Sequence, residues 1–251
     1  MHNLVAMFAN VAQNASLTNL SPVTDPLITI QNSRFIFPFD VQIGCLLANV
    51  VDGSRCRINT PSYRSVALPE VYPVKVTAGN GTNPPIQGPM WDTLRIPRND
   101  EFGLDVSRAG AGAADCFAGI WYAQGRTPAP SGPVITLRAT VTMTLVVGNW
   151  VTGNLTFDQS LPYGKYAITG MSCQCTSAMF GRLAFPGGTQ YRPGVPAVEV
   201  YGSYINPQAF RMGNFGLFGV FDSTAQPLIE IMGYAAGAQS AVILLDLIKI
   251  G

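Results

Sequence analysis

Two stretches of the chain, residues 98–141 and 211–250, share three short matches in the same order, and this feature constrains the fold most. In the earlier stretch the matching segments are Phe102-Gly103-Leu104, Tyr122-Ala123-Gln124-Gly125 and Val134-Ile135 with Leu137. In the later stretch they are Phe215-Gly216-Leu217, Tyr234-Ala235-Ala236-Gly237 and Val242-Ile243 with Leu245. The separation of the copies is about one small domain, longer than solenoid repeats, which favours a duplicated β-domain. Chance matches of Tyr, Gly and Val between two strand-rich halves are the alternative.

Short apolar segments between turn residues predict strands in both halves. In the second half, about eight such segments follow one another at the spacing typical of a sandwich or barrel. Eight strands favour the jelly roll, in which two Greek keys form two packed sheets. We therefore predict an all-β chain with two tandem eight-stranded jelly rolls (β-sandwiches), at residues 27–148 and 149–251. Gly148 to Gly153 is the expected boundary.

Residues 1–26 are predicted to form a separate N-terminal arm with a short helix. Leu4, Val5, Phe8 and Val11 fall on one helical face, and the prolines that follow disfavour further helix. Such an arm would dock on a neighbouring subunit or a membrane surface. A disordered terminus is the alternative.

Composition indicates a surface that neighbours cover. Hydrophobic residues make up 47% of the chain and charged residues 12%, against about 25% charged in an ordinary soluble domain. Much of the surface must then be apolar or neutral polar, as in a subunit of an assembly. The net charge of +1 gives no electrostatic case for specific nucleic-acid binding.

The cysteines indicate buried thiols in a protein made in a reducing cytoplasm. Five are present, an odd number, and Cys173 and Cys175 alternate on one face of an expected strand. Neither feature is typical of a disulfide framework. There is no CxxC pair and His2 is the only histidine, so no zinc site is expected. We recognise neither a signal peptide nor an apolar run of about 18 residues that would span a membrane.

No catalytic, cofactor-binding or metal-binding residues are predicted, and the chain is not expected to be an enzyme. Catalysis needs titratable groups that converge, and the adjacent pair Asp100-Glu101 would point to opposite faces of a strand. Residues 109–114 (AGAGAA) predict a turn rather than a phosphate-binding loop. Trp91 could form a sugar-binding platform. Four acids could bind Ca²⁺ at loop ends, although no spaced ligand loop is visible: Asp52, Asp100, Asp105 and Asp222.

The tandem pattern, the arm and the low charge resemble the double jelly-roll major capsid proteins of tailless icosahedral viruses, many of which contain an internal membrane. This resemblance is architectural, covers nearly the whole chain and rests on no specific motif. The chain is short for that family. The resemblance implies homotrimers with a pseudo-hexagonal outline that self-assemble into an icosahedral shell, with residues 77–93 as an outer loop and residues 1–20 as an inner arm.

The same resemblance implies a place and partners for the protein. It would be a virion component synthesised in the host cytoplasm. Its partners would be neighbouring capsomers, minor capsid or vertex proteins and, through the arm, an internal lipid membrane.

Three other classes remain open. A lectin-like or receptor-binding surface or spike module would be a stable monomer with a site on its loops. An amidase built on two jelly rolls would need clustered carboxylates. A single-jelly-roll minor capsid or spike protein would fit if the duplication were not real.

Overall fold

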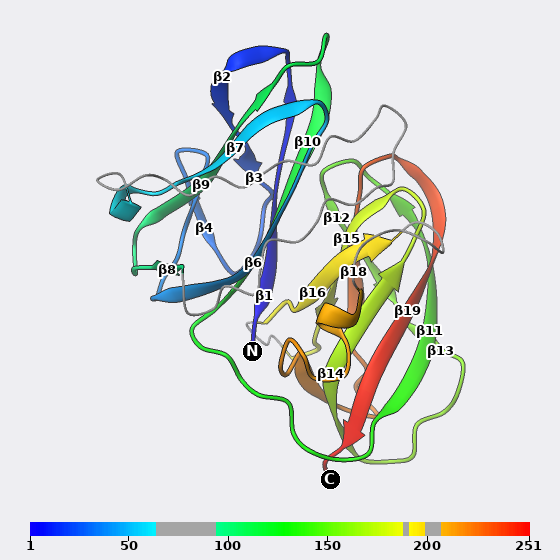
Figure 1. Cartoon of the computed structure of the whole chain (residues 1–251). Helices are drawn as coiled ribbons and strands as arrows, with labels where there is room; N and C mark the ends of the chain where they lie inside the picture. The colour runs from blue at the N-terminus through cyan, green and yellow to red at the C-terminus, as the bar shows by residue number, and fades with distance from the viewer. Residues whose placement is uncertain (64–93, 188–190, 199–206) are drawn as a thin grey trace. The chain divides into compact units, whose positions relative to one another are not determined.

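The computed structural model describes residues 1–63, 94–187, 191–198 and 207–251. Within them, helix is limited to two short 3₁₀ segments, η1 (Pro61–Tyr63) and η2 (Pro207–Phe210), so the predicted all-β class is confirmed. The chain divides into two compact units (Figure 1). We call Val5–Gly125 the N-terminal unit. Arg126–Gly251 together with Met1–Leu4 form the C-terminal unit.

The N-terminal unit contains two antiparallel sheets. One follows the order β3 (Ser21–Pro22), β1 (Asn3–Val11), β10 (Ala114–Ala123), β6 (Val41–Val50), β8 (Arg95–Ile96). In the other sheet β9 (Glu101–Arg108) is central and pairs with β2 (Asn14–Asn19), β7 (Gly53–Asn59) and β5 (Arg34–Ile36), and β5 pairs with β4 (Thr29–Gln31). If jelly-roll strands are lettered B to I in chain order, β1-β10-β6-β8 is the B-I-D-G sheet and β2-β9-β7 takes the places C, H and E.

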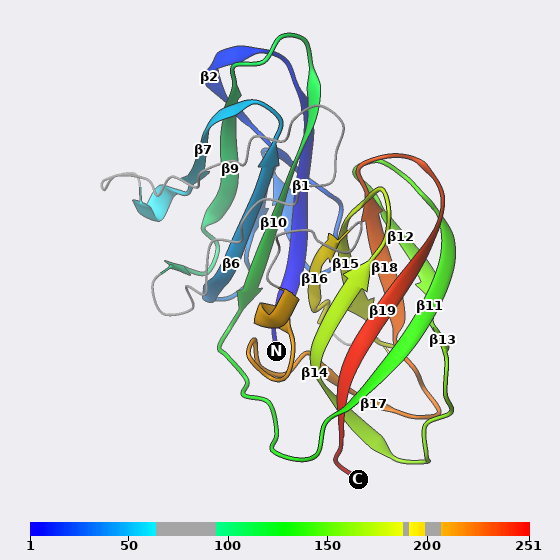
Figure 2. The ribbon, with the colours of Figure 1, turned by 45° about the vertical axis from the view of Figure 1, so that its right-hand side comes forward.

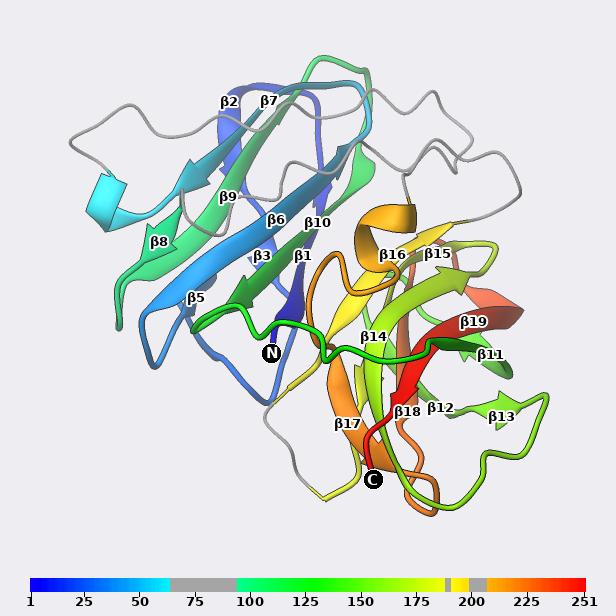
Figure 3. The same ribbon diagram turned by 60° about the horizontal axis from the view of Figure 1, so that its bottom comes forward.

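The C-terminal unit repeats this order (Figure 3). Its B-I-D-G sheet is β11 (Ile135–Leu145), β19 (Gly237–Lys249), β14 (Lys165–Gln174) and β17 (Gly219–Asp222). Its C-H-E-F sheet is β12 (Trp150–Asn154), β18 (Leu228–Gly233), β15 (Ala178–Ala184) and β16 (Gly194–Val198). The two sheets join where β16 also pairs with the end of β14, and the short strand β13 (Thr156–Phe157) extends the free edge of β11. The predicted pair of jelly rolls is confirmed by this strand order.

The three sequence matches that suggested a repeat do not join equivalent strands of the two jelly rolls. Each match is displaced by one strand. Phe102 lies in β9, the H strand, whereas Phe215 precedes β17, the G strand. Tyr122 lies in β10, the I strand, whereas Tyr234 follows β18, the H strand. The third match joins β11 and β19, which pair with each other in one sheet of the C-terminal unit. The repeated strand order is therefore real, but these three matches do not align equivalent strands.

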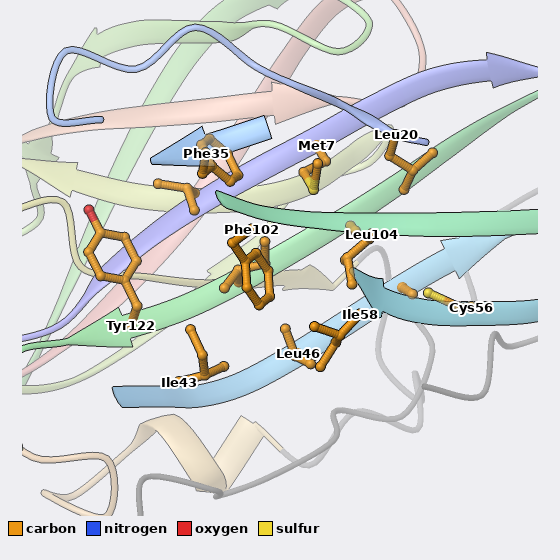
Figure 4. Close-up of a cluster of buried hydrophobic side chains, with 14 of the residues drawn as sticks. Met7, Leu20, Phe35, Ile43, Leu46, Cys56, Ile58, Phe102, Leu104 and Tyr122 are labelled. Carbon is orange, nitrogen blue, oxygen red and sulfur yellow. The ribbon is translucent and has the colours of Figure 1, made fainter. Parts of the chain in front are cut away.

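An aromatic cluster fills the core of the N-terminal unit (Figure 4). The rings of Phe37 and Tyr122 have centroids 4.9 Å apart, and those of Phe37 and Phe102 lie 6.0 Å apart. Leu104 in β9 and Ile58 in β7, two paired strands of one sheet, extend this cluster. Inward positions on each strand alternate with outward ones, as a two-sheet sandwich requires.

The predicted N-terminal helical arm is wrong. Residues 3–19 form β1 and β2 of the first jelly roll, and Val5, Met7 and Val11 are buried in its core. On a strand, Val5, Met7 and Val11 share one face, whereas Leu4 and Phe8 lie on the other. Pairing of β1 with β10 decides in favour of the strand. Because Val5, Met7 and Val11 are buried in the jelly roll, these side chains are not available for the membrane contact that a helical arm would make.

The predicted domain boundary is also displaced. The division falls between Gly125 and Arg126 rather than at residues 148–153, and residues 5–26 belong to the first jelly roll. The reason is β11, which pairs with β19 from Ile135↔Leu247 to Leu145↔Gly237 and so is the first strand of the second jelly roll. Residues 148–153 lie after its B strand β11 and include the first four residues of its C strand β12, which begins at Trp150.

Candidate assembly surfaces

The first four residues, which we call the N-terminal anchor (Met1–Leu4), form part of the C-terminal unit. The amide of Leu4 donates to the carbonyl of Arg192 over 2.8 Å, and the amide of Arg192 donates to Oδ1 of Asn3 over 2.6 Å. Nη1 of Arg182 donates to the carbonyl of Leu4 over 2.9 Å. The amide and the carbonyl of Leu4 and the side chain of Asn3 are thus all hydrogen-bonded to residues of the same unit.

A buried charge network underlies the anchor. Arg182 is only 1% exposed, and its Nε lies 2.6 Å from Oε2 of Glu230. Its guanidinium also lies 4.0 Å from the ring centroid of Trp150, within cation–π range. Arg192 adds a longer contact of 3.7 Å to Glu230. Because a buried charge is tolerated only when it is paired and hydrogen-bonded, this network fixes the position of Leu4.

His2 is buried beside two aromatic rings of the same unit. Its ring meets the rings of Phe215 and Phe218 edge to face, with centroids 4.8 and 4.6 Å apart. Burial lowers the pKa of His2 to about 3, against the opposing effect of a hydrogen bond with the backbone of Gly194. The imidazole is therefore neutral at physiological pH and serves packing.

The strands β11, β19 and β14 lie side by side in one sheet (Figure 2). We call the outer side of these strands, which carries mainly Thr and Ser side chains, the hydroxyl face. Inward neighbours such as Val141 and Ile243 are buried, whereas the outward residues are exposed or half-exposed. In cross-strand register, Thr142 lies opposite Ser240, and their hydroxyls are 3.2 Å apart. The face comprises Thr136, Arg138, Thr140, Thr142, Thr144, Ser172, Gln174, Ser240, Val242 and Leu244.

Charges on and beneath the hydroxyl face are paired within the unit. Arg138 binds Asp158 at 2.7 Å at the margin. Asp246 is fully buried and accepts two hydrogen bonds of 2.6 Å from Arg211, one of 2.9 Å from the amide of Met212 and one of 2.8 Å from Thr136. Burial raises the pKa of Asp246, but these hydrogen bonds together hold it below its usual value. The face thus presents hydrogen-bonding groups with almost no net charge.

In the N-terminal unit the outer side of β5, β7 and β9 has a different character, and we call it the charged face (Arg34, Arg55, Arg57, Asn59, Glu101, Asp105). Cys56 and Ile58 point inward, and the arginines beside them in β7 point outward. Asp105 accepts a 2.6 Å hydrogen bond from Asn59 and lies 3.6 Å from Arg57. Arg34 and Glu101 are 3.9 Å apart.

The acids considered as metal or catalytic candidates occupy structural turns or strand faces. Oδ2 of Asp100 accepts hydrogen bonds from the hydroxyl of Thr60 and the amide of Ser62. Asp222 accepts from the amide and hydroxyl of Thr224. In the described ranges no three or more His, Cys, Asp or Glu side chains are grouped closely enough to hold a metal ion. Trp91 and residues 77–93 lie outside those ranges.

Residues 109–113 form the connection between β9 and β10, and Ala114 begins β10, in agreement with the predicted turn. Gly112 adopts a φ of 74°, which favours glycine. Nη1 of Arg108 donates to the carbonyl of Gly112 over 2.9 Å and to that of Val11 over 2.7 Å. This buried arginine, which the sequence analysis did not single out, fixes the turn.

All five cysteines are buried and none forms a disulfide, in agreement with the prediction. Burial raises the pKa of Cys45 to about 12 and the pKa values of Cys116 and Cys175 to about 11. These thiols are therefore protonated and unreactive near neutral pH.

In the part of the chain that the structure describes, no helix has the length and apolar character to cross a membrane. No protein-family model matches this chain. No curated protein matches it either.

Two solved structures are similar to this chain. The first is the major capsid protein P2 from Bacteriophage PM2, with 11% identity over 100% of this chain and 98% of that chain and a TM-score of 0.23. The second is the STIV MCP, with 10% identity over 99% of this chain and 97% of that chain and a TM-score of 0.21. Because both TM-scores are low, the jelly-roll assignment rests on the strand order and registers of this chain.

Proposed function

We propose that this protein is a structural viral major capsid protein that self-assembles as pseudo-hexagonal homotrimers into an icosahedral shell. The observation that carries the proposal is the tandem pair of jelly rolls with one strand order. Three such chains supply six similar lobes, which is what a pseudo-hexagonal tile needs. Fold alone does not establish function, so the surface chemistry of the two units is the second support.

The exposed surface suits repeated association. The hydroxyl face offers short side chains whose burial costs little rotamer entropy, and its charged groups are paired internally. The low overall fraction of charged residues, 12%, likewise lowers the cost of burying the surface against another copy. Many modest contacts repeated by symmetry can then hold a shell without strong individual interactions.

The work of such a protein is association rather than catalysis, and its place is the virion after synthesis in the host cytoplasm. The buried thiols without disulfides are compatible with a reducing compartment. Its partners in the shell are neighbouring capsomers, together with minor capsid or vertex proteins.

Light scattering on the purified full-length protein tests this proposal. The expected mass is that of three chains, stable on dilution into the micromolar range. A protein that stays monomeric at high concentration and low salt would contradict the capsid function and favour the lectin-like alternative, which a glycan-binding screen would then test.

A further inference from the structure

The strand β11 has one edge that is largely unpaired. Its other edge pairs with β19 along the whole strand. On the open edge only Ala139 and Thr140 have strand partners, Phe157 and Thr156 of β13. Figures 1 and 2 show β11 at the margin of the C-terminal unit, with β13 along part of this edge. Within the described part of the chain, residues 141–145 therefore have no strand partner on the open edge.

The backbone groups of Thr142 and Thr144 point to this open edge. The amide of Asp158 donates to the carbonyl of Arg138 over 3.0 Å on the same edge. Because the backbone groups of successive residues in an antiparallel strand point alternately to its two edges, those of every even-numbered residue in β11 point there. Thr142 and Thr144 lie beyond the end of β13, and both are exposed. Their N–H and C=O groups are two donors and two acceptors that a further strand would pair.

Other edge strands carry features that discourage pairing, whereas this part of β11 does not. The strand β7 carries Arg55 and Arg57, and β3 consists of two residues and includes Pro22. Charged side chains, proline and short length all protect a sheet edge from pairing with another chain. Residues 141–145 contain no charge, proline or glycine, and threonine and valine favour strands. The open edge of β11 is therefore suited to accept a strand.

This edge is complementary to its own copy in an antiparallel register. If Met143 lies on a two-fold axis, Thr142 of each copy faces Thr144 of the other. The even-numbered backbone groups of both copies then meet, and they form four hydrogen bonds. The side chains that face each other are threonines, so no like charges are opposed. The outer sides of the two sheets lie on the same side of the joined sheet.

We infer that β11 of one copy pairs with β11 of a second copy, antiparallel and with Met143 on the two-fold axis, so that two C-terminal jelly rolls share one continuous sheet. This contact goes beyond the proposed trimer, because an edge that binds its own copy joins two chains and does not close a ring of three. It would link one trimer to the next. Four hydrogen bonds form a weak contact by themselves, which suits an assembly that repeats the contact by symmetry.

Disulfide formation tests the register with a matched control. In this register the two copies of residue 143 form a pair without hydrogen bonds, with Cα atoms about 4.5 Å apart, which a disulfide can bridge. Met143→Cys is therefore expected to give a covalent dimer in oxidised glutathione. Val141→Cys is equally buried, at 6% exposure against 8% for Met143, but its two copies would be more than about 13 Å apart. It should stay uncross-linked, as should the wild type, whose five cysteines are buried.

An absence of covalent dimers from Met143→Cys, or equal dimer formation by the two variants, would overturn the inference. The melting temperature of each variant shows whether the fold is retained. If Met143→Cys does not fold, the substitutions of the exposed Thr142 described next provide the test.

Substitutions at Thr142 test the backbone contact without changing the buried side chains. Thr142→Pro removes an N–H that points away from β19, so the pairing of β11 with β19 is kept. Two of the four hydrogen bonds between the copies are lost, and the association is expected to weaken about 10- to 30-fold. Thr142→Lys should also weaken it, because a lysine protects an edge. Ser240→Lys adds the same charge to the neighbouring strand of the hydroxyl face and should leave the association unchanged.

Sedimentation velocity over a range of concentrations measures these changes. Unchanged association of Thr142→Pro and Thr142→Lys, with both variants folded, would contradict pairing through this edge.

Light scattering separates failure of the contact from failure of the proposed function. If the wild-type protein forms trimers and shells but Met143→Cys gives no covalent dimer, the proposed function stands and the β11 contact is wrong. If the wild-type protein is at most a dimer and Met143→Cys is cross-linked, the proposed trimer fails and the β11 contact stands.

Discussion

The two jelly rolls share one strand order but place their charged side chains differently. In the N-terminal unit, Arg57 pairs with Asp105 on the outer side of a sheet, and Asp105 and Arg108 are buried. In the C-terminal unit, Asp246 is fully buried beneath Arg211, and Arg182 is 1% exposed against Glu230. The alternation of inward apolar residues is sufficient to form both sandwiches, so the outer faces are free to differ. The comparison teaches that strand order is repeated while surface chemistry is specialised.

The largest effect is expected in the aromatic core of the N-terminal unit. Phe102→Ala should lower the free energy of unfolding by about 3–5 kcal/mol, because it removes a buried ring and leaves a cavity. Denaturant unfolding measures the change, with the exposed Thr144→Ala as control, for which less than about 0.5 kcal/mol is expected. A loss below about 1 kcal/mol would mean that this core is loosely packed.

The buried network of the C-terminal unit sharpens the contrast between buried and exposed charge. Arg182→Met should destabilise the protein by about 2–4 kcal/mol, because it leaves Glu230 without its closest cation and Leu4 without a donor. The exposed pair provides the control: Arg138→Met should cost less than about 1 kcal/mol although its contact is equally short. Equal effects in the two variants would contradict the claim that burial sets the difference.

A pH titration of stability probes the N-terminal anchor. The pKa of His2 is depressed to about 3 in the folded protein, so the unfolded chain binds more protons below its own pKa of about 6.5. Stability should therefore fall as pH drops from about 6.5 towards 3, by up to about 1.4 kcal/mol per pH unit from this group. Unfolding midpoints measured across this range should lose this slope in His2→Phe. An unchanged slope in that variant would assign the acid sensitivity to other groups.

A smaller loss of stability is expected at Gly153, and it tests how closely the two sheets of the C-terminal unit pack against each other. A Cβ on Gly153 would lie 2.6 Å from Cγ2 of Val141 and 2.7 Å from Cε of Met143. Gly153→Ala should cost about 1–3 kcal/mol in thermal or chemical unfolding. Gly125→Ala, where no atom lies within 4 Å, is the control, and its expected effect is below about 1 kcal/mol. Equal stability of the two variants would argue against close packing at Gly153.

Sequence reasoning predicted what depends on local pattern. Alternation and turn residues identify strands such as Leu228–Gly233, and turn chemistry identifies residues 109–114. It failed where two periods compete in one segment: Val5, Phe8 and Val11 fit a helical face, whereas Val5, Met7 and Val11 fit a strand face, and pairing with β10 decides. The repeat was matched one strand out of step, because β-strands of similar composition resemble one another whether or not they are equivalent.

The candidate surfaces depended on long-range register and so were not predictable residue by residue. Thr142 faces Ser240 from 98 residues away, and Arg182 reaches Leu4 from 178 residues away. The alternation of residues 136–144 already places the threonines on one side of β11. Only the strand register shows that Ser240 lies beside Thr142.

Electron microscopy of the purified full-length protein tests the central claim most directly. The account predicts particles of three chains with six similar lobes in a pseudo-hexagonal outline, or closed shells built from them. Single two-lobed particles at every concentration and salt condition would contradict it.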